Sequence, residues 1–162
     1  MSRRSENFRF RLRVVCALTV AMCSACQAPF QAGRGNLPRG TIEISRAGEP
    51  LATFDVELAL TPADQGTGLM NRRSLPPDRG MAFLFSTPVR QPFHMLNTLI
   101  PLDIAFWDEG NEIIDVLTMT PCTEQPCQSY LAASNFVGAL EVNAGVLETE
   151  GVRPGDRVVL KQ

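Results

Sequence analysis

Residues Gln91–Trp107 read QPFHMLNTLIPLDIAFW, an apolar stretch that contains the four polar side chains His94, Asn97, Thr98 and Asp103. A polar group that is buried needs a hydrogen-bonding partner, so this stretch is not a plain core strand. Either its polar groups brace the fold or they form a site. The residues alone leave both interpretations open, and the surrounding chain indicates the architecture that holds them.

Predicted strands make up most of that surrounding chain. Alternation places Phe54, Val56, Leu58 and Leu60 on one face of a strand, and Asp108–Asn111 is a turn that predicts a hairpin. The strands are predicted at residues 41–45, 53–60, 81–86, 102–108, 112–119, 136–142 and 157–161.

Two short helices are predicted between these strands. Thr61 is a typical N-cap, Pro62 suits the first helical position, and Asp64 follows in the first turn, so a helix is expected from there to about Asn71. A second helix is expected at 144–150, ended by Gly151. The pattern predicts a mainly-β fold, a small antiparallel barrel or sandwich with two short helices. A ferredoxin-like α+β arrangement is the alternative.

The N-terminus has the features of an export signal. Five arginines precede a short apolar run at 14–22, which is too short to span a bilayer, and Ser24-Ala25-Cys26 resembles a lipoprotein cleavage site. We expect a signal peptide at 1–25, lipidation at Cys26, a flexible tether at 26–40 and one domain at 41–162. Ordinary secretory cleavage is the alternative. The expected location is the periplasm or outer cell surface, with membrane contact only through the lipid anchor.

The charge balance argues against nucleic acid as a partner. Residues from Cys26 onward carry ten Lys and Arg against sixteen Asp and Glu, a net charge of −6, without a basic cluster. Cys122 and Cys127 lie five residues apart and predict a structural disulfide in an exported protein. A redox-active pair, the alternative, would normally use Cys-x-x-Cys.

Five segments carry a resemblance to a known family. They are GLMNR (68–72), RGMAFLF (79–85), FHMLNTLIPLDIAF (93–106), PCTEQPCQSY (121–130) and ALEVNAG (139–145). Together they resemble the domain of unknown function 192 family, also called uncharacterised protein family 0127. The resemblance implies a mainly-β domain, often exported or lipid-anchored, without an established activity. Two positions depart from the family phrase: His94 stands where members usually have Trp, and Leu96 where they have Lys.

The polar residues of these segments predict a single binding site. We expect Arg72, Asn97, Thr98, Asp103, Glu141 and Asn143 to lie together, with residues 88–92, 122–127 and 143–145 as a rim. The interpretation that requires least of the residues is a non-catalytic module that binds an unidentified small molecule or an envelope protein. No cofactor is expected.

Two chemical alternatives remain. Asp103 and Glu141, with Asp55 as a further carboxylate, resemble the paired acids of a hydrolase. His94 and Met95, with Met70, Met81 and Met119 elsewhere, are possible ligands for Cu(I). Methionines among Leu and Phe are more often core residues, and the sequence shows neither a zinc ligand set nor a Gly-x-Ser-x-Gly nucleophile.

Overall fold

The computed structural model describes residues 37–162. The predicted signal peptide, Cys26 and most of the predicted tether lie outside these residues. Within them, no helix has the length and apolar character needed to cross a membrane.

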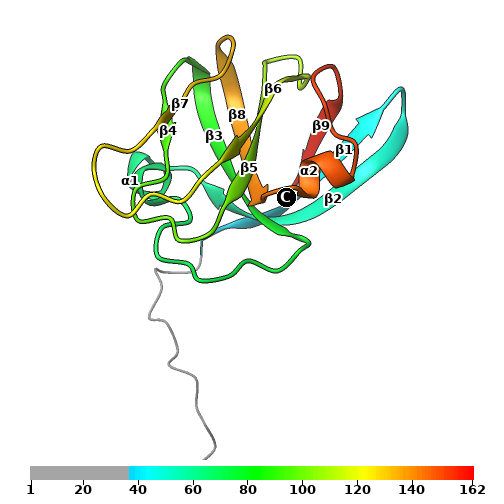
Figure 1. Ribbon diagram of the computed structural model, residues 1–162. Helices are drawn as coiled ribbons and strands as arrows, with labels where there is room; N and C mark the ends of the chain where they lie inside the picture. The colour runs from blue at the N-terminus through cyan, green and yellow to red at the C-terminus, as the bar shows by residue number, and fades with distance from the viewer. Residues whose placement is uncertain (1–36) are drawn as a thin grey trace, which may run out of the picture. The chain divides into compact units, whose positions relative to one another are not determined.

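A curved sheet of seven strands, in the order β6-β5-β8-β3-β2-β1-β9, forms the body of residues 37–162 (Figure 1). Neighbouring strands are antiparallel except β2 and β3, which are parallel. The sheet strands are β1 (Arg39–Arg46), β2 (Glu49–Ala59), β3 (Arg79–Val89), β5 (Leu102–Trp107), β6 (Ile113–Met119), β8 (Phe136–Asn143) and β9 (Arg157–Lys161). The predicted mainly-β class is confirmed, and the sheet is open where a barrel or sandwich was expected.

The two edge strands approach each other at one end, which gives the sheet its curvature. The Ile113 amide of β6 donates to the Asp156 carbonyl at 2.8 Å, and the Val158 amide of β9 donates to the Asn111 carbonyl at 2.9 Å. These bonds do not continue along the strands, so the edges meet without closing a barrel. Arg46 of β1 holds the same corner through Asp156, with a 2.7 Å contact from Nε to Oδ1.

The strand predictions hold with small shifts at their ends. β1 begins at Arg39, inside the predicted tether, and β2 ends at Ala59. Leu60 is therefore exposed, and the buried Ala59 packs on the opposite face of the sheet from Leu58. The sequence did not reveal the second, two-stranded sheet of β4 (Phe93–His94) and β7 (Ser129–Tyr130).

Both predicted helices exist and are shorter than expected. Helix α1 (Pro62–Thr67) begins at Thr61, whose hydroxyl accepts from the Asp64 amide at 3.2 Å. It ends at Gly68, whose φ of 44° and ψ of −133° leave the helical region, so the helix cannot reach Asn71. Helix α2 (Val146–Thr149) is a single turn.

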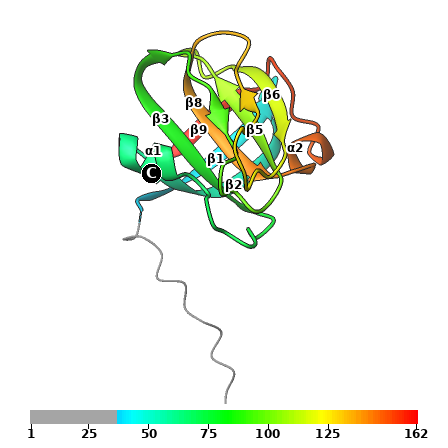
Figure 2. The same ribbon diagram turned by 60° about the vertical axis from the view of Figure 1, so that its left-hand side comes forward.

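Each face of the sheet covers its own hydrophobic cluster. One cluster lies among β1, β2, β9 and α2, and the other lies beneath β4, β7 and the loops on the opposite face. Figures 1 and 2 show α1 and α2 on opposite sides of the sheet. Strand β5 is buried along its whole length because it contributes alternate residues to both clusters.

Gly138 is required by the packing of β5 against β8. It lies opposite Trp107 in the register, and a Cβ at this position would overlap the indole ring. The indole ring of Trp107 therefore occupies the space that a side chain at position 138 would need.

Candidate functional site

A cleft of about 400 Å³ lies beside α1 and β4, on the face of the sheet that carries the second cluster. Glu141 of β8, Phe83 of β3 and the edge of α1 line it. The lining residues are Pro62, Gln65, Gly66, Thr67, Gly68, Leu69, Met70, Phe83, Gln91, Pro92, Phe93, His94, Thr98 and Glu141. The cleft therefore combines one buried acid with apolar and uncharged polar walls.

Glu141 is the unusual residue of this cleft. Its register partners are Met81 on β3 and Ile104 on β5, and it is 6% exposed. Within residues 37–162 its carboxyl oxygens form no hydrogen bond or ion pair. Every fully enclosed side-chain oxygen or nitrogen of these residues has a hydrogen-bonding partner. Because the carboxyl oxygens of Glu141 have none, they are not fully enclosed and open into the cleft.

Burial changes the ionisation of this acid. Because the apolar surroundings disfavour the charged form, they raise the pKa of Glu141 from 4.5 to about 8. At neutral pH the group is therefore mainly a neutral carboxylic acid, with one O–H donor and one carbonyl acceptor directed at the cleft.

The wall formed by α1 is fixed to the sheet. The Gln65 side-chain amide donates to the Leu84 carbonyl at 2.8 Å and to the Ala59 carbonyl at 3.3 Å. Gly68, which ends the helix, lies against the ring of Phe83, and a Cβ added there would come within 3.3 Å of that ring. These contacts hold a glycine-rich backbone edge over the floor of the cleft.

The facing wall is β4 and the segment that follows it. Phe93 packs edge-on against Phe83, with ring centroids 5.1 Å apart, and His94 is exposed at the rim. Thr98 is 4% exposed and its side chain lines the cleft. An aromatic floor, a histidine and a threonine hydroxyl thus surround the opening to Glu141.

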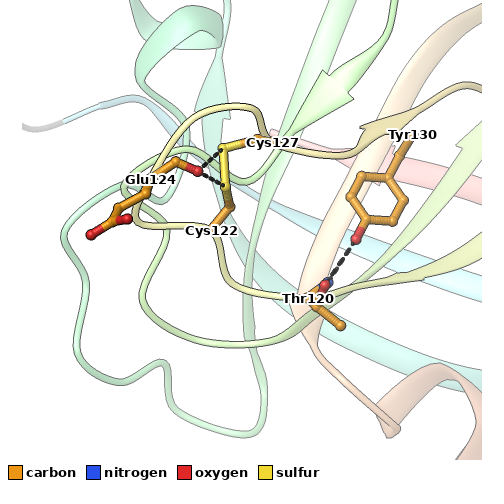
Figure 3. The surroundings of a disulfide bond; sticks show 5 residues. All are labelled: Thr120, Cys122, Glu124, Cys127 and Tyr130. Carbon is orange, nitrogen blue, oxygen red and sulfur yellow. Dashed lines mark hydrogen bonds between the residues drawn. A yellow bond between two sulfur atoms is a disulfide. The ribbon is translucent and has the colours of Figure 1, made fainter.

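The disulfide loop, drawn in Figure 3, is joined to this wall by backbone hydrogen bonds. Cys122 and Cys127 are joined, and the Cys122 backbone accepts from the Asn97 amide at 2.8 Å and donates to the Met95 carbonyl at 3.3 Å. The Tyr130 hydroxyl accepts from the Thr120 amide at 2.9 Å, which ties the start of the same loop to β7. The structure places the two cysteines at bonding distance, as a disulfide requires, and their loop braces residues 95–98.

Two asparagines connect the loops on either side of the cleft. Asn71 and Asn97 have φ values of 62° and 58°, a left-handed conformation that Asn tolerates better than most residues. The Asn71 amide donates to the Asn97 carbonyl at 2.8 Å. The left-handed backbone at position 97 therefore explains why an asparagine occurs there, and its side chain is exposed.

The structure does not bring the six predicted site residues together. Thr98 and Glu141 share the cleft. Arg72 forms a bidentate pair with Glu57 at 2.7 and 2.8 Å. Asn143 donates to the Leu75 carbonyl at 2.9 Å, and so fastens a loop to the end of β8. The expectation of a single site built from all six residues is wrong, because four of them serve local structure or another part of the surface.

Asp103 lies on the opposite face of the sheet from Glu141. Its register partner is Val142, whereas Glu141 is opposite Ile104. Asp103 accepts from the Thr118 hydroxyl at 2.8 Å and from the Leu147 amide of α2 at 3.2 Å, so it holds that helix in place. The two carboxylates therefore do not face one substrate, and the paired-acid arrangement is absent from residues 37–162. Asp55 is exposed and pairs with Arg79 at 3.3 Å.

The side chains named for Cu(I) also diverge. His94 is exposed at the rim, while Met95 is 1% exposed and belongs to the hydrophobic cluster. Met81 and Met119 are likewise core residues. Residues 37–162 contain no group of three or more His, Cys, Asp or Glu side chains arranged to hold a metal ion.

The sequence pattern missed most of the lining. Phe83 occurs within a quoted segment, where it looks like an ordinary core residue, and Met70 was considered only as a ligand for Cu(I). Gln65 carries no motif signal, whereas Gln91 and Pro92 belong to the segment 88–92 that was expected at the rim and do line the cleft. The cleft forms because α1 and β4, far apart in sequence, meet over one strand, and no local spacing predicts that contact.

Comparison with known proteins identifies the family. A family model described as "Uncharacterized ACR", domain of unknown function 192, matches residues 42–160. A search of curated proteins gives no match. A crystal structure described as a "putative transcription regulator" from Sinorhizobium meliloti 1021 is 31% identical, covers 79% of this chain and 98% of its own, and has a TM-score of 0.72. A protein of unknown function from Novosphingobium aromaticivorans DSM 12444 is 32% identical, with 76% and 86% coverage and a TM-score of 0.68. The chain belongs to the domain of unknown function 192 family.

Proposed function

We propose that the protein is a non-catalytic binding module of the cell envelope and that its ligand is a small molecule held in the Glu141 cleft. The observation that carries this proposal is the buried Glu141 carboxyl, which opens into a cleft without a partner from residues 37–162. The cleft volume of about 400 Å³ falls within the range of small-molecule sites.

The buried Glu141 carboxyl lowers the free energy of unfolding. A carboxyl group without a hydrogen-bonding partner destabilises the folded state, and a glutamine or methionine at this position would cost less. Residues that lower stability in this way are typical of functional sites, where a ligand supplies the missing contacts.

Binding is favoured over hydrolysis by the composition of the cleft. Acid–base hydrolysis of a glycoside needs two carboxyl groups facing one bond, and Glu141 is the single carboxyl in the lining. Asp103, the second predicted acid, binds the Leu147 amide on the other face of the sheet. The cleft also lacks a serine or cysteine nucleophile among its lining residues.

The regulator description of the Sinorhizobium protein is not carried over to this chain. The sequence has a net charge of −2 before any processing, and the residues after the predicted signal are more acidic still. Proteins that bind nucleic acid through its phosphates concentrate Lys and Arg on one face, and the residues from Cys26 onward contain no such cluster.

The envelope location rests on the sequence of the N-terminus and on the disulfide. Disulfides persist in oxidising compartments such as the periplasm, and Cys122–Cys127 is consistent with export. Cell fractionation with and without a Cys26→Ser substitution tests this part of the proposal. The wild-type chain should sediment with membranes and the variant should be released in soluble form; a chain found in the cytoplasm would contradict export.

A thermal-shift screen tests the binding proposal. Wild-type protein, Glu141→Gln and the control Glu148→Gln are screened against amines, alcohols, small acids, sugars and nucleotides. Glu148 is an exposed acid on α2, so its variant matches the charge change without touching the cleft. A ligand present at 100 times its Kd should stabilise the protein by about 2.7 kcal/mol. Hits shared by the wild type and the Glu148 variant but lost from Glu141→Gln support the cleft; no hits in any class contradict it.

A further inference from the structure

We infer that the ligand of the Glu141 cleft is a small organic cation, an ammonium group carried on an apolar body. This inference rests on the proposed binding function and adds the chemical class of the ligand. It follows from the charges, the walls and the depth of the acid in the cleft.

The charge of the lining disfavours an anion as the natural occupant. Glu141 and His94 are the ionisable residues of the lining, which contains no Lys, Arg or Asp. An anion entering the cleft would find no permanent positive charge, and it would approach a buried acid whose ionisation it opposes. A cation would instead find an acid that has no competing partner among residues 37–162.

The walls of the cleft suit an apolar body that carries the charge. Phe83 is buried, Phe93 packs against it with centroids 5.1 Å apart, and Leu69 and Met70 add further apolar surface to the lining. Aromatic faces and methionine sulfur both attract organic cations. The Thr98 hydroxyl, which also lines the cleft and bonds to no other described residue, provides an additional acceptor for an ammonium N–H.

Cation binding should be coupled to release of a proton from Glu141. Since burial raises the pKa of Glu141 to about 8, the free protein holds a neutral acid at neutral pH. An ammonium ion favours the carboxylate, so its affinity should rise about tenfold per pH unit below the pKa and become constant above it.

The groups around Glu141 leave one other source of pH dependence. Met81 of β3 and Ile104 of β5 flank the acid, α1 contributes no ionisable lining residue, and Thr98 does not titrate in this range. His94 of β4 is the remaining titratable lining group. The pH series is therefore measured in a His94→Asn background, in which Glu141 is the single titratable residue of the lining.

The test uses three probes of one shape and three charges: benzylammonium, benzyl alcohol and benzoate. Binding of each to the full chain is measured by calorimetry from pH 6 to pH 9, with Glu141→Gln as the test variant and Glu148→Gln as the control. At pH 9 benzylammonium should bind roughly tenfold or more tightly than benzyl alcohol, as a charge-assisted hydrogen bond implies. The preference should disappear in Glu141→Gln and persist in Glu148→Gln.

The outcomes separate this inference from the proposed function. Tighter binding of the alcohol or the benzoate than of the ammonium, with loss of that binding in Glu141→Gln, would overturn the cation and leave the cleft as a binding site. Ammonium binding that is unaffected by Glu141→Gln would overturn the inference as well. Failure of all three probes, together with a blank thermal-shift screen, would overturn both.

Discussion

Replacing Glu141 with glutamine should make the protein more stable at alkaline pH. Glutamine has nearly the shape of the neutral acid and cannot ionise, so it removes the cost of a buried charge without creating a cavity. The expected gain follows from the pKa of Glu141, which burial raises from 4.5 to about 8. At about 1.4 kcal/mol per pKa unit, the wild type loses roughly 5 kcal/mol of unfolding free energy as this group ionises.

The direction of the pH dependence follows from proton binding. Between pH 4.5 and about 8 the folded state holds a proton on Glu141 that the unfolded chain has released. Stability from this group is therefore complete below pH 4.5, falls as the pH rises, and is constant above about pH 8. The value of roughly 5 kcal/mol is an upper estimate, because the carboxyl opens into a cleft that admits water.

Urea unfolding at intervals from pH 5 to pH 9 measures the effect for wild type, Glu141→Gln and Glu148→Gln. The free energy of unfolding of Glu141→Gln should exceed that of the wild type by an amount that grows with pH up to about pH 8, while the m-value stays constant. The control should follow the wild type, because Glu148 is exposed. Parallel curves for the wild type and Glu141→Gln would refute the argument that this acid is buried without a partner.

Three further predictions concern the framework. Asp156→Asn should cost about 2 kcal/mol of unfolding free energy at pH 7, less than for a fully buried pair, because the Arg46 side chain is 36% exposed. Burial raises the pKa of Asp156, but hydrogen bonds from Arg46 and the Arg153 amide outweigh burial and lower that pKa. The stability advantage of the wild type in urea unfolding should therefore vanish as the pH falls below 3.8. Gly138→Ala should destabilise the fold by roughly 1–3 kcal/mol and change the fluorescence of Trp107, the single tryptophan; unchanged fluorescence and stability would contradict the packing described for β5 and β8. Reduction of Cys122–Cys127 should cost about 2 kcal/mol and shift the NMR amide signals of residues 95–98; signals that do not move would show that the loop does not brace the cleft wall.

The strands could be predicted because their information is local. Alternation in β2, the hairpin turn before β6 and the Pro-Gly-Asp turn before β9 each lie within a few residues of the element they define. The N-cap of α1 was predicted on the same basis, from Thr61 and Pro62. Its end was missed because the helix stops at Gly68, whose backbone leaves the helical region before Asn71.

The site could be predicted only in part, because it depends on contacts between distant segments. Glu141 stands out in an apolar strand, and the sequence alone singles it out as a candidate. Strand register decides on which face of the sheet Glu141 lies. Glu141 and Asp103 occur in neighbouring strands, but the register places them on opposite faces. Asn97 also looked functional, whereas its left-handed backbone explains its presence.

The ionisation of Glu141 is measured directly by a ¹³C NMR titration of its side-chain carboxyl, assigned by comparison with Glu141→Gln, in the absence and presence of benzylammonium. We expect a midpoint near pH 8 for the free protein, which moves to lower pH when the ammonium ion binds. A midpoint near 4.5 that benzylammonium leaves unchanged would show a hydrated carboxylate outside any ligand cleft, and would contradict the account.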